Sequence, residues 1–271
     1  MNEVDGVIFD WAGTTVDFGC FAPVQAFLKV FADAGIAVTV EEARLPMGML
    51  KRDHIRTMLA MPQISSQWTK KIGRPFAEED VEALHERFEP LLLSSLENYT
   101  KLLPAVRETV HLLRQKGLKI GSTTGYTDSM MQIVAKGAKE QGYEPDFWVT
   151  PDSTASYGRP YPYMIFKNME ALRLKAPWTV VKVGDTVADV QEGVRACVWS
   201  VGVVAGSSQL GLSETEFEEL PVPETIEKIK RAEQAFFSAG ADFVITSMKE
   251  LPELIECING LLQEGKRPYA G

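Results

Sequence analysis

Short apolar runs alternate along most of the chain with longer segments in which apolar residues recur every three or four positions. The short runs predict buried strands, and the longer segments predict amphipathic helices. We expect strands at residues 6–10, 118–124, 146–150, 179–185, 199–204 and 242–246, and helices at residues 104–117, 128–142, 161–174 and 186–197. Repeated strand–helix units are typical of an α/β protein with a doubly wound, Rossmann-like parallel sheet.

Residues 20–100 depart from this alternation. Their apolar residues follow a helical spacing, as in "FAPVQAFLKVFADAG" and "EEDVEALHERFEPLLLSSLENY", and they contain no convincing strand pattern. We interpret this segment as an α-helical cap domain inserted after the first strand, with the core domain formed by residues 1–19 and 101–271. The alternative is that these helices merely elaborate the core.

The composition narrows the class of protein. The chain has 271 residues and a net charge of -9, with 45% hydrophobic and 24% charged residues, as in a soluble globular protein. The acidic balance argues against a nucleic-acid or anionic-membrane partner, because phosphate groups are bound by Lys and Arg patches. No segment resembles a membrane span or a signal peptide, and Cys20, Cys197 and Cys257 are few and far apart. We therefore predict a cytoplasmic protein.

Polar residues stand at the ends of three predicted strands. They are Asp10, the pair Thr123 and Thr124, and Asp185, with Asp189 one helical turn later. Ligands of open parallel sheets bind at the carboxyl ends of the strands, and oxygen ligands suit a hard cation such as Mg²⁺. Each of these residues taken alone is equally compatible with a helix cap.

Four motifs together resemble the signature of the haloacid dehalogenase superfamily, and the resemblance covers nearly the whole chain. They are "FDWAGTTVD", "GSTTG", Arg159 in "YGRPYP", and "VGDTVAD". The resemblance implies that Asp10 is a nucleophile that becomes an aspartyl-phosphate, and that Thr124 and Arg159 hold the phosphoryl oxygens. It also implies Mg²⁺ as cofactor, with ligands from Asp10, the backbone carbonyl of Ala12, Asp185 and Asp189. Without the family, Arg159 is equally compatible with a surface or a structural ion-pairing residue.

Ala12 departs from the phosphatases of that superfamily, where an acid at this position protonates the departing alcohol oxygen. General acid catalysis of this kind is typically worth ~10²–10⁴ in rate. Its loss is tolerable where the leaving group is not an oxygen, which leaves halide displacement from carbon or cleavage of a phosphorus–carbon bond. The superfamily's dehalogenases do not need magnesium, so the intact "GDTVAD" favours phosphorus.

A carbon leaving group needs an electron sink, because a free carbanion is too unstable to depart. An imine formed with a lysine supplies one, by accepting the electron pair as an enamine. In "PMGMLKRDHIRTML", Lys51 stands near the start of a predicted helix and His54 lies three residues later on the same face. The helix N-terminus and the neighbouring methionines both favour a neutral amine. Without further information, Lys51 could be a solvated helix lysine and His54 a structural histidine.

A second resemblance supports the imine. "FDWAGTTVD", "GCFAP", "PMGMLKRDH", "KIGSTTGY" and "GRPYP" together resemble the phosphonatase branch of the superfamily. This implies phosphonoacetaldehyde as the small-molecule substrate, a Schiff base on Lys51, and Gly125, Tyr126 and His54 around the substrate. It also implies a homodimer joined through the cap domain. The rival functions are a magnesium-dependent phosphomonoesterase and a non-enzymatic binding protein on the same fold.

Overall fold

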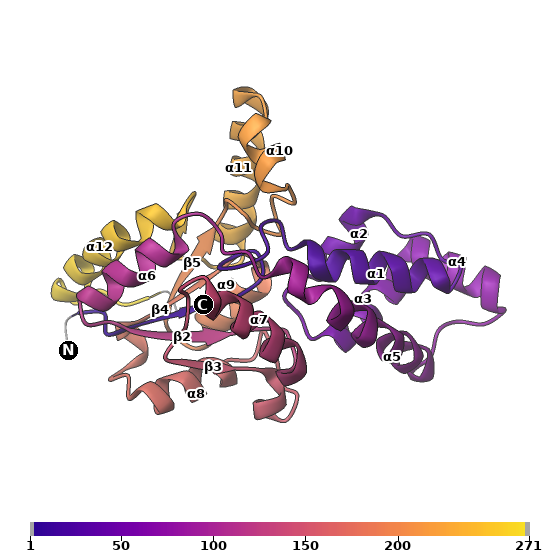
Figure 1. Ribbon diagram of the computed structural model, residues 1–271, viewed down its shortest axis with the longest axis horizontal. Helices are drawn as coiled ribbons and strands as arrows, with labels where there is room; N and C mark the ends of the chain where they lie inside the picture. The colour runs from indigo at the N-terminus through magenta and orange to yellow at the C-terminus, as the bar shows by residue number, and fades with distance from the viewer. Residues whose placement is uncertain (1–2, 269–271) are drawn as a thin grey trace.

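In the computed structural model, which describes residues 3–268, parallel strands form one six-stranded sheet in the order β3-β2-β1-β4-β5-β6 (Figure 1). The strands are Gly6–Phe9 (β1), Lys119–Thr123 (β2), Phe147–Val149 (β3), Val180–Gly184 (β4), Trp199–Val203 (β5) and Phe243–Ile245 (β6). Each of them lies within a predicted strand. The doubly wound α/β class is therefore confirmed.

The register of the three central strands brings their carboxyl ends together. β1 lies between β2 and β4, and Phe9 pairs with Ser122 on one side and with Val183 on the other. Asp10 follows Phe9 directly, and its backbone N–H donates to the carbonyl oxygen of Val183 at 2.9 Å. The predicted polar residues at the strand ends consequently lie at one edge of the sheet.

Four predicted core helices are confirmed as Val106–Gln115 (α6), Asp128–Glu140 (α7), Tyr163–Leu172 (α8) and Val187–Arg195 (α9). Three further helices, Glu214–Glu219 (α10), Val222–Ser238 (α11) and Leu251–Gln263 (α12), lie outside the predicted segments. Helices α10 and α11 project from the sheet (Figure 1). The first turns of α11 expose Val222 and Ile226, whereas Ala232 and Phe236 farther along the helix are buried.

The helices cover both faces of the sheet, as alternation along the strands requires. Val7 and Phe9 of β1 belong to a large core that includes residues of α6, α7 and α12. Ile8, between them in sequence, packs on the opposite face in a second cluster with Ile165 of α8. The central strand is thus buried on both sides, which explains its uninterrupted apolar run.

The helical segment after β1 forms the predicted inserted cap. It contains Phe21–Asp33 (α1), Val40–Arg44 (α2), Lys51–Ala60 (α3), Pro62–Ile72 (α4), Glu78–Ser95 (α5) and the 3-10 turn Leu96–Tyr99 (η1). Helices α1 to α5 gather beside the sheet (Figure 1), and the Phe27 ring of α1 stacks on the Phe88 ring of α5 with centroids 4.3 Å apart. The boundaries at residues 20 and 100 stay a prediction. Among residues 3–268, no helix has both the length and the apolar character of a membrane span.

Asp17 fixes the start of the cap. Its carboxylate accepts hydrogen bonds from the backbone N–H groups of Phe21 and Ala22, both at 3.0 Å. These are the first two orphan donors of α1, which a side chain must satisfy where water is excluded. The Asp17 backbone N–H donates to the carbonyl of Lys101 at 3.2 Å. Asp17 therefore connects the chain that leaves the core both to the first cap helix and to the chain that re-enters the core after the cap.

Asp17→Asn is expected to flatten the pH dependence of stability. Burial raises the pKa of Asp17 from 3.8 to about 7, so between these values the folded chain holds a proton that the unfolded chain has released. This contribution to the free energy of unfolding is complete below the unfolded pKa and is lost as pH rises through the folded pKa. At ~1.36 kcal/mol per unit, the loss is of the order of 4 kcal/mol. Urea unfolding of the wild type and of Asp17→Asn across this pH interval measures the loss. A free energy of unfolding that changes with pH in the same way in both proteins would contradict the prediction.

Candidate active site

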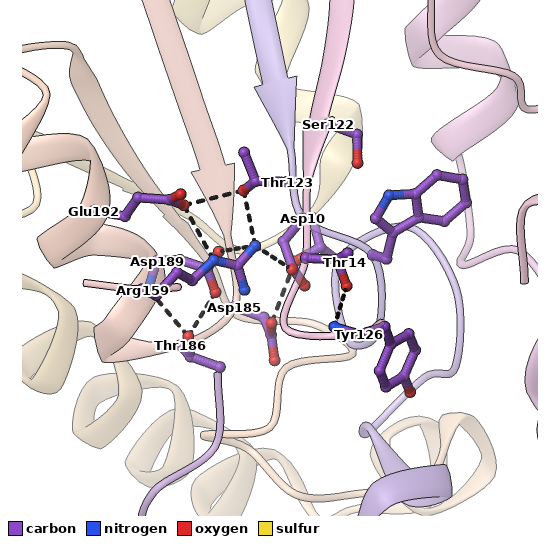
Figure 2. A network of polar contacts seen from close by, with 12 residues as sticks. Asp10, Thr14, Ser122, Thr123, Tyr126, Arg159, Asp185, Thr186, Asp189 and Glu192 are labelled. Atoms are coloured by element: carbon purple, nitrogen blue, oxygen red, sulfur yellow. Dashed lines mark hydrogen bonds and ion pairs between the residues drawn. The ribbon is translucent and has the colours of Figure 1, made fainter. Parts of the chain in front are cut away.

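Three carboxylates meet at the carboxyl edge of the sheet. Asp10 follows β1, Asp185 follows β4, and Asp189 lies in the first turn of α9. One oxygen from each lies within 4.8 Å of the others, and all three side chains are buried. The Thr186 hydroxyl donates to Asp189 at 2.5 Å (Figure 2), and Ser208 N–H donates to Asp185 at 2.7 Å. These hydrogen bonds orient both carboxylates. The structure thus brings together the acidic residues predicted to bind metal.

Arg159 reaches into this cluster from the loop before α8. Its Nη2 lies 2.6 Å from Asp10 Oδ1 and 3.1 Å from Asp189 Oδ1, and its Nε lies 3.0 Å from Glu192 Oε2 (Figure 2). The Arg159 side chain is only 2% exposed. The surface alternative is therefore wrong, whereas the buried ion pairs of Arg159 fit the structural alternative as well as a guanidinium that faces a phosphoryl group bound at Asp10.

Burial and the neighbouring charges shift the pKa values of the three carboxylates. Burial and repulsion from Asp189 raise the pKa of Asp10, although Arg159 opposes the change. Burial and repulsion from Asp10 raise the pKa of Asp185 well above its ordinary value. For Asp189, the attraction of Arg159 and Lys182 outweighs burial, and the pKa is lowered.

The donor set fits a divalent cation. The four buried carboxylates of Asp10, Asp185, Asp189 and Glu192 face two buried cations, Arg159 and Lys182, which leaves two negative charges when all are ionised. A carboxylate-rich site with unbalanced negative charge suits Mg²⁺, which binds oxygen. Burial, together with this excess charge, raises the pKa values of Asp10 and Asp185.

Ala12, Thr124, Gly125 and Tyr126 line the same pocket as Asp10. The Thr124 hydroxyl accepts a hydrogen bond from the backbone N–H of Tyr126 at 3.1 Å, which fixes its side chain beside the strand end. Position 12 offers a methyl group to the pocket where an acid would stand in a phosphatase-like site. The pocket wall therefore has no proton donor at that residue.

Lys51 enters the pocket from the cap. It is the first residue of α3 and only 5% exposed, so the alternative of a solvated helix lysine is wrong. Its Nζ lies 5.2 Å from the ring centroid of Tyr126 and 5.9 Å from that of Phe27. Burial lowers the pKa of Lys51, against the opposing attraction of nearby acidic groups. The surroundings therefore favour the neutral, nucleophilic amine more than water does.

His54 is a buried neighbour of Lys51 on the same helix. Its ring stacks on Phe27 at 3.8 Å between centroids, and its Nε2 lies 2.9 Å from the carbonyl oxygen of Ala43. Because a carbonyl only accepts, Nε2 carries the hydrogen and Nδ1 carries the lone pair. Nδ1 has no hydrogen-bond partner among the described residues. Burial and the charge of Lys51 lower the pKa of His54 well below its ordinary value, so the ring rests neutral.

The pocket closes where the cap meets the strand ends. Met47, Gly48 and Lys51 of the cap line it together with the core residues, and its volume is about 20 Å³. That is room for one or two water molecules, so the pocket is narrow. A Cβ on Gly125 would lie 3.1 Å from the Met49 carbonyl oxygen, and one on Gly48 would lie 2.4 Å from Thr186 Oγ1. Gly48 also has a φ of +89°, so this position needs glycine, whereas a side chain at Gly125 would crowd the backbone of the cap.

Two buried charged residues of the site were not predicted. Lys182 in β4 contacts Asp189 at 2.7 Å, and Glu192 in α9 contacts Arg159. A signal exists for each of them. A lysine within the apolar run "VVKVG" must find buried partners, and Glu192 stands three residues after Asp189, on the same helical face.

The geometry agrees with comparisons to known proteins. A family model described as haloacid dehalogenase-like hydrolase matches residues 4–196, and the chain therefore belongs to this family of enzymes. Its inserted helical cap, the carboxylate of Asp10 at the end of β1 and the acidic cluster are the features that the resemblance in sequence implied.

Closer relatives define the branch. The chain is 54% identical to a phosphonoacetaldehyde hydrolase of Lysinibacillus sphaericus, over 95% of this chain and 96% of the relative. It is 50% identical to a phosphonoacetaldehyde hydrolase of Bacteroides fragilis, over 97% and 99% of the two chains. A crystal structure of a phosphonoacetaldehyde hydrolase-like protein from Oleispira antarctica matches with a TM-score of 0.95 and 38% identity, over 98% and 96% of the chains. Within its family, the chain groups with the phosphonoacetaldehyde hydrolases and is a hydrolase, not a non-enzymatic binding protein.

Proposed function

We propose that the protein hydrolyses the phosphorus–carbon bond of phosphonoacetaldehyde to acetaldehyde and inorganic phosphate. The observation that carries the proposal is one narrow pocket with a buried carboxylate from the core, a buried amine from the cap, and an alanine where an acid would serve an oxygen leaving group. The names of the close relatives support the same substrate.

The first step uses Lys51. Its ammonium gives up a proton, and the neutral amine adds to the aldehyde carbon. The hydroxyl group of the adduct takes up that proton and leaves as water, and an iminium ion joins the lysine to the substrate. Burial lowers the pKa of Lys51, so less free energy is needed to deprotonate it at neutral pH. The rings of Tyr126 and Phe27 flank the amine and favour a resulting iminium cation through their faces.

The second step uses Asp10. Its carboxylate attacks phosphorus, the phosphorus–carbon bond breaks, and the electron pair of that bond moves into the iminium to give an enamine. An aspartyl-phosphate remains on Asp10. Arg159, 2.6 Å from the Asp10 carboxylate, offsets the repulsion between the attacking carboxylate and the phosphoryl group. No proton is needed by the leaving group at this step, which is consistent with Ala12.

The remaining steps release both products. The enamine carbon takes a proton relayed through Nδ1 of His54, and the acidity of an imidazolium at this buried position favours donation. Water then hydrolyses the imine, which frees acetaldehyde and restores Lys51. A second water cleaves the aspartyl-phosphate, and Thr124 and Arg159 hold the phosphoryl oxygens as inorganic phosphate departs.

Mg²⁺ is the proposed cofactor. Asp10, the carbonyl of Ala12, Asp185 and Asp189 would hold it, and the ion would supply charge neutralisation for the phosphoryl group when bound. Asp10 and Asp185 then ionise together without the repulsion that raises their pKa values. Both carboxylates are therefore expected to stabilise the fold more with Mg²⁺ than without it.

Adding Mg²⁺ to metal-free protein is expected to raise its melting temperature. At one hundred times the dissociation constant, binding to the folded state alone contributes about 2.7 kcal/mol. Asp185→Asn removes a ligand charge and is expected to abolish most of this shift. Calorimetric melting of the wild type and of Asp185→Asn, with and without Mg²⁺, measures this shift in melting temperature. A shift of the same size in Asp185→Asn would contradict the assignment.

A homodimer joined through the cap and a cytoplasmic location complete the proposal. Leu45, which directly follows α2, and Ile72 of α4 are 74% and 44% exposed, which supports a cap surface that another subunit covers. Light scattering of the wild type and of Leu45→Glu tests the dimer.

The proposed reaction is tested by product analysis. Phosphonoacetaldehyde should yield equal amounts of acetaldehyde and phosphate, and Lys51→Arg should yield neither. The rival phosphomonoesterase predicts turnover of sugar or nucleotide phosphates and indifference to Lys51→Arg. Release of phosphate from such esters without acetaldehyde from phosphonoacetaldehyde would overturn the proposal.

A further inference from the structure

We propose that Thr123, Lys182 and Glu192 are positioning residues that hold Arg159 so that its Nη1 faces the bound phosphoryl group. These three residues, called here the arginine bracket, come from three elements: β2, β4 and α9. The proposal rests on the proposed function, because it assigns to Arg159 the binding of the phosphoryl oxygens.

The hydroxyl of Thr123 is the centre of the bracket. Its Oγ1 accepts hydrogen bonds from Arg159 Nη2 and from Lys182 Nζ, both at 2.9 Å, and donates to Glu192 Oε2 at 3.0 Å (Figure 2). A hydroxyl has one donor and two acceptor sites, so all of its hydrogen-bonding capacity is used. Its orientation is therefore fixed by three buried partners at once.

The charged members complete the bracket. Glu192 Oε2 accepts from Arg159 Nε at 3.0 Å, and Lys182 Nζ lies 3.5 Å from the same oxygen. Lys182 Nζ also lies 2.7 Å from Asp189 Oδ1. Lys182 and Glu192 side chains are 1% and 0% exposed. Removing one partner of such a buried set leaves the others unpaired, so the geometry is strongly enforced.

The bracket determines which donors of Arg159 remain available. Nε donates to Glu192, and Nη2 donates to Thr123 and to Asp10. Within the part of the chain that the structure describes, Nη1 contacts no acceptor, although Arg159 lines the pocket. The planar guanidinium holds these nitrogens in a rigid fork, so fixing Nε and Nη2 also fixes the direction of Nη1.

The bracket acts through Arg159 and not on the substrate. Thr123, Lys182 and Glu192 do not line the pocket, whereas Thr124, the next residue after Thr123, does. A displaced guanidinium would still be charged but would meet the transition state in the wrong geometry. Positioning of this kind affects kcat more than KM, because the correct contacts matter most when charge develops on the transferring group.

Thr123→Val tests the inference, because valine matches threonine in shape and lacks the hydroxyl. We expect kcat for phosphonoacetaldehyde to fall about 10- to 100-fold while KM changes by less than about threefold. Thr123→Ser restores the hydroxyl and is expected to recover most of the lost kcat. Unchanged kcat in Thr123→Val, or an equal loss in Thr123→Ser, would overturn the proposal.

A double-mutant cycle separates positioning from a general structural effect. In an Arg159→Lys background the fork is absent, so Thr123→Val is expected to lower kcat by less than about twofold. Equal losses in both backgrounds would show that Thr123 does not act through Arg159. If Thr123→Val fails to fold, Glu192→Gln, which keeps the shape and an acceptor for Nε, enters the same cycle.

Binding of orthovanadate, measured by calorimetry with the same variants, distinguishes this proposal from the proposed function. An inactive wild type would refute turnover of phosphonoacetaldehyde. The bracket would still predict that Thr123→Val weakens orthovanadate binding about 10-fold and that Thr123→Ser does not. Equal affinity in all three proteins would overturn the bracket whatever the substrate.

Discussion

Asp10→Asn is expected to lower kcat by at least about 10⁴-fold, because the amide cannot attack phosphorus and no other described carboxylate is aligned to replace it. Asp10 is held at the end of β1, and Arg159 lies 2.6 Å from its carboxylate. The change keeps the shape of the side chain, so the loss measures chemistry and not packing. Steady-state release of phosphate, with a melting curve to show that the variant folds, provides the measurement.

Asp33→Asn is the matched control for this variant. Asp33 is an exposed carboxylate of the cap that pairs with Lys29 at 2.5 Å. Exposed pairs contribute little, so kcat should be unchanged. A residual rate in Asp10→Asn within about tenfold of the wild type would contradict the nucleophilic role.

Lys51→Arg is expected to abolish the release of acetaldehyde, with a loss of at least about 10³-fold, because a guanidinium does not form the imine. The residue is buried at the first position of α3, between aromatic rings. Lys51→Met, which keeps a long unbranched side chain without charge, is expected to be equally inactive. A coupled assay of acetaldehyde compares the activity of the two variants with that of the wild type.

Lys70→Arg is the control for the lysine variants, because Lys70 lies on the exposed surface of α4. It is expected to keep wild-type activity. Activity of Lys51→Arg near that of Lys70→Arg would exclude an imine and would favour the phosphomonoesterase alternative.

The strand ends were predictable from the sequence because the relevant physics is local. Apolar runs ending in Asp10, Thr123 or Asp185 already place polar groups at one edge of a parallel sheet. The register confirms that edge, since Phe9 pairs with both Ser122 and Val183. Most site residues named by the family motifs line one pocket for the same reason, whereas His54 and Asp189 lie behind its wall, in contact with Phe27 and with Arg159 respectively.

The environment of Lys51 could not be derived from periodicity. Spacing places Lys51 and His54 on one helical face, but it does not say what that face packs against. The stack of Phe27 on His54 brings together residues of α1 and α3, and Tyr126 comes from the core. Burial of the amine is therefore a product of tertiary packing.

The contacts within the arginine bracket could not be predicted from the sequence for a different reason. Glu192 and Lys182 lie in segments that were predicted correctly as helix and strand, yet their contacts cross between β2, β4 and α9. A lysine in an apolar strand indicates a buried partner without identifying it. Helix α11 was missed because its exposed Val222 and Ile226 obscure any single buried face.

Borohydride reduction in the presence of phosphonoacetaldehyde directly tests whether Lys51 forms an imine with the substrate. Reduction of the imine would leave a stable adduct on Lys51, which peptide mass spectrometry locates, and Lys70 would stay unmodified. We expect inactivation that depends on the substrate and increases in parallel with the labelling of Lys51. An active enzyme that shows no adduct on Lys51 under these conditions would contradict it.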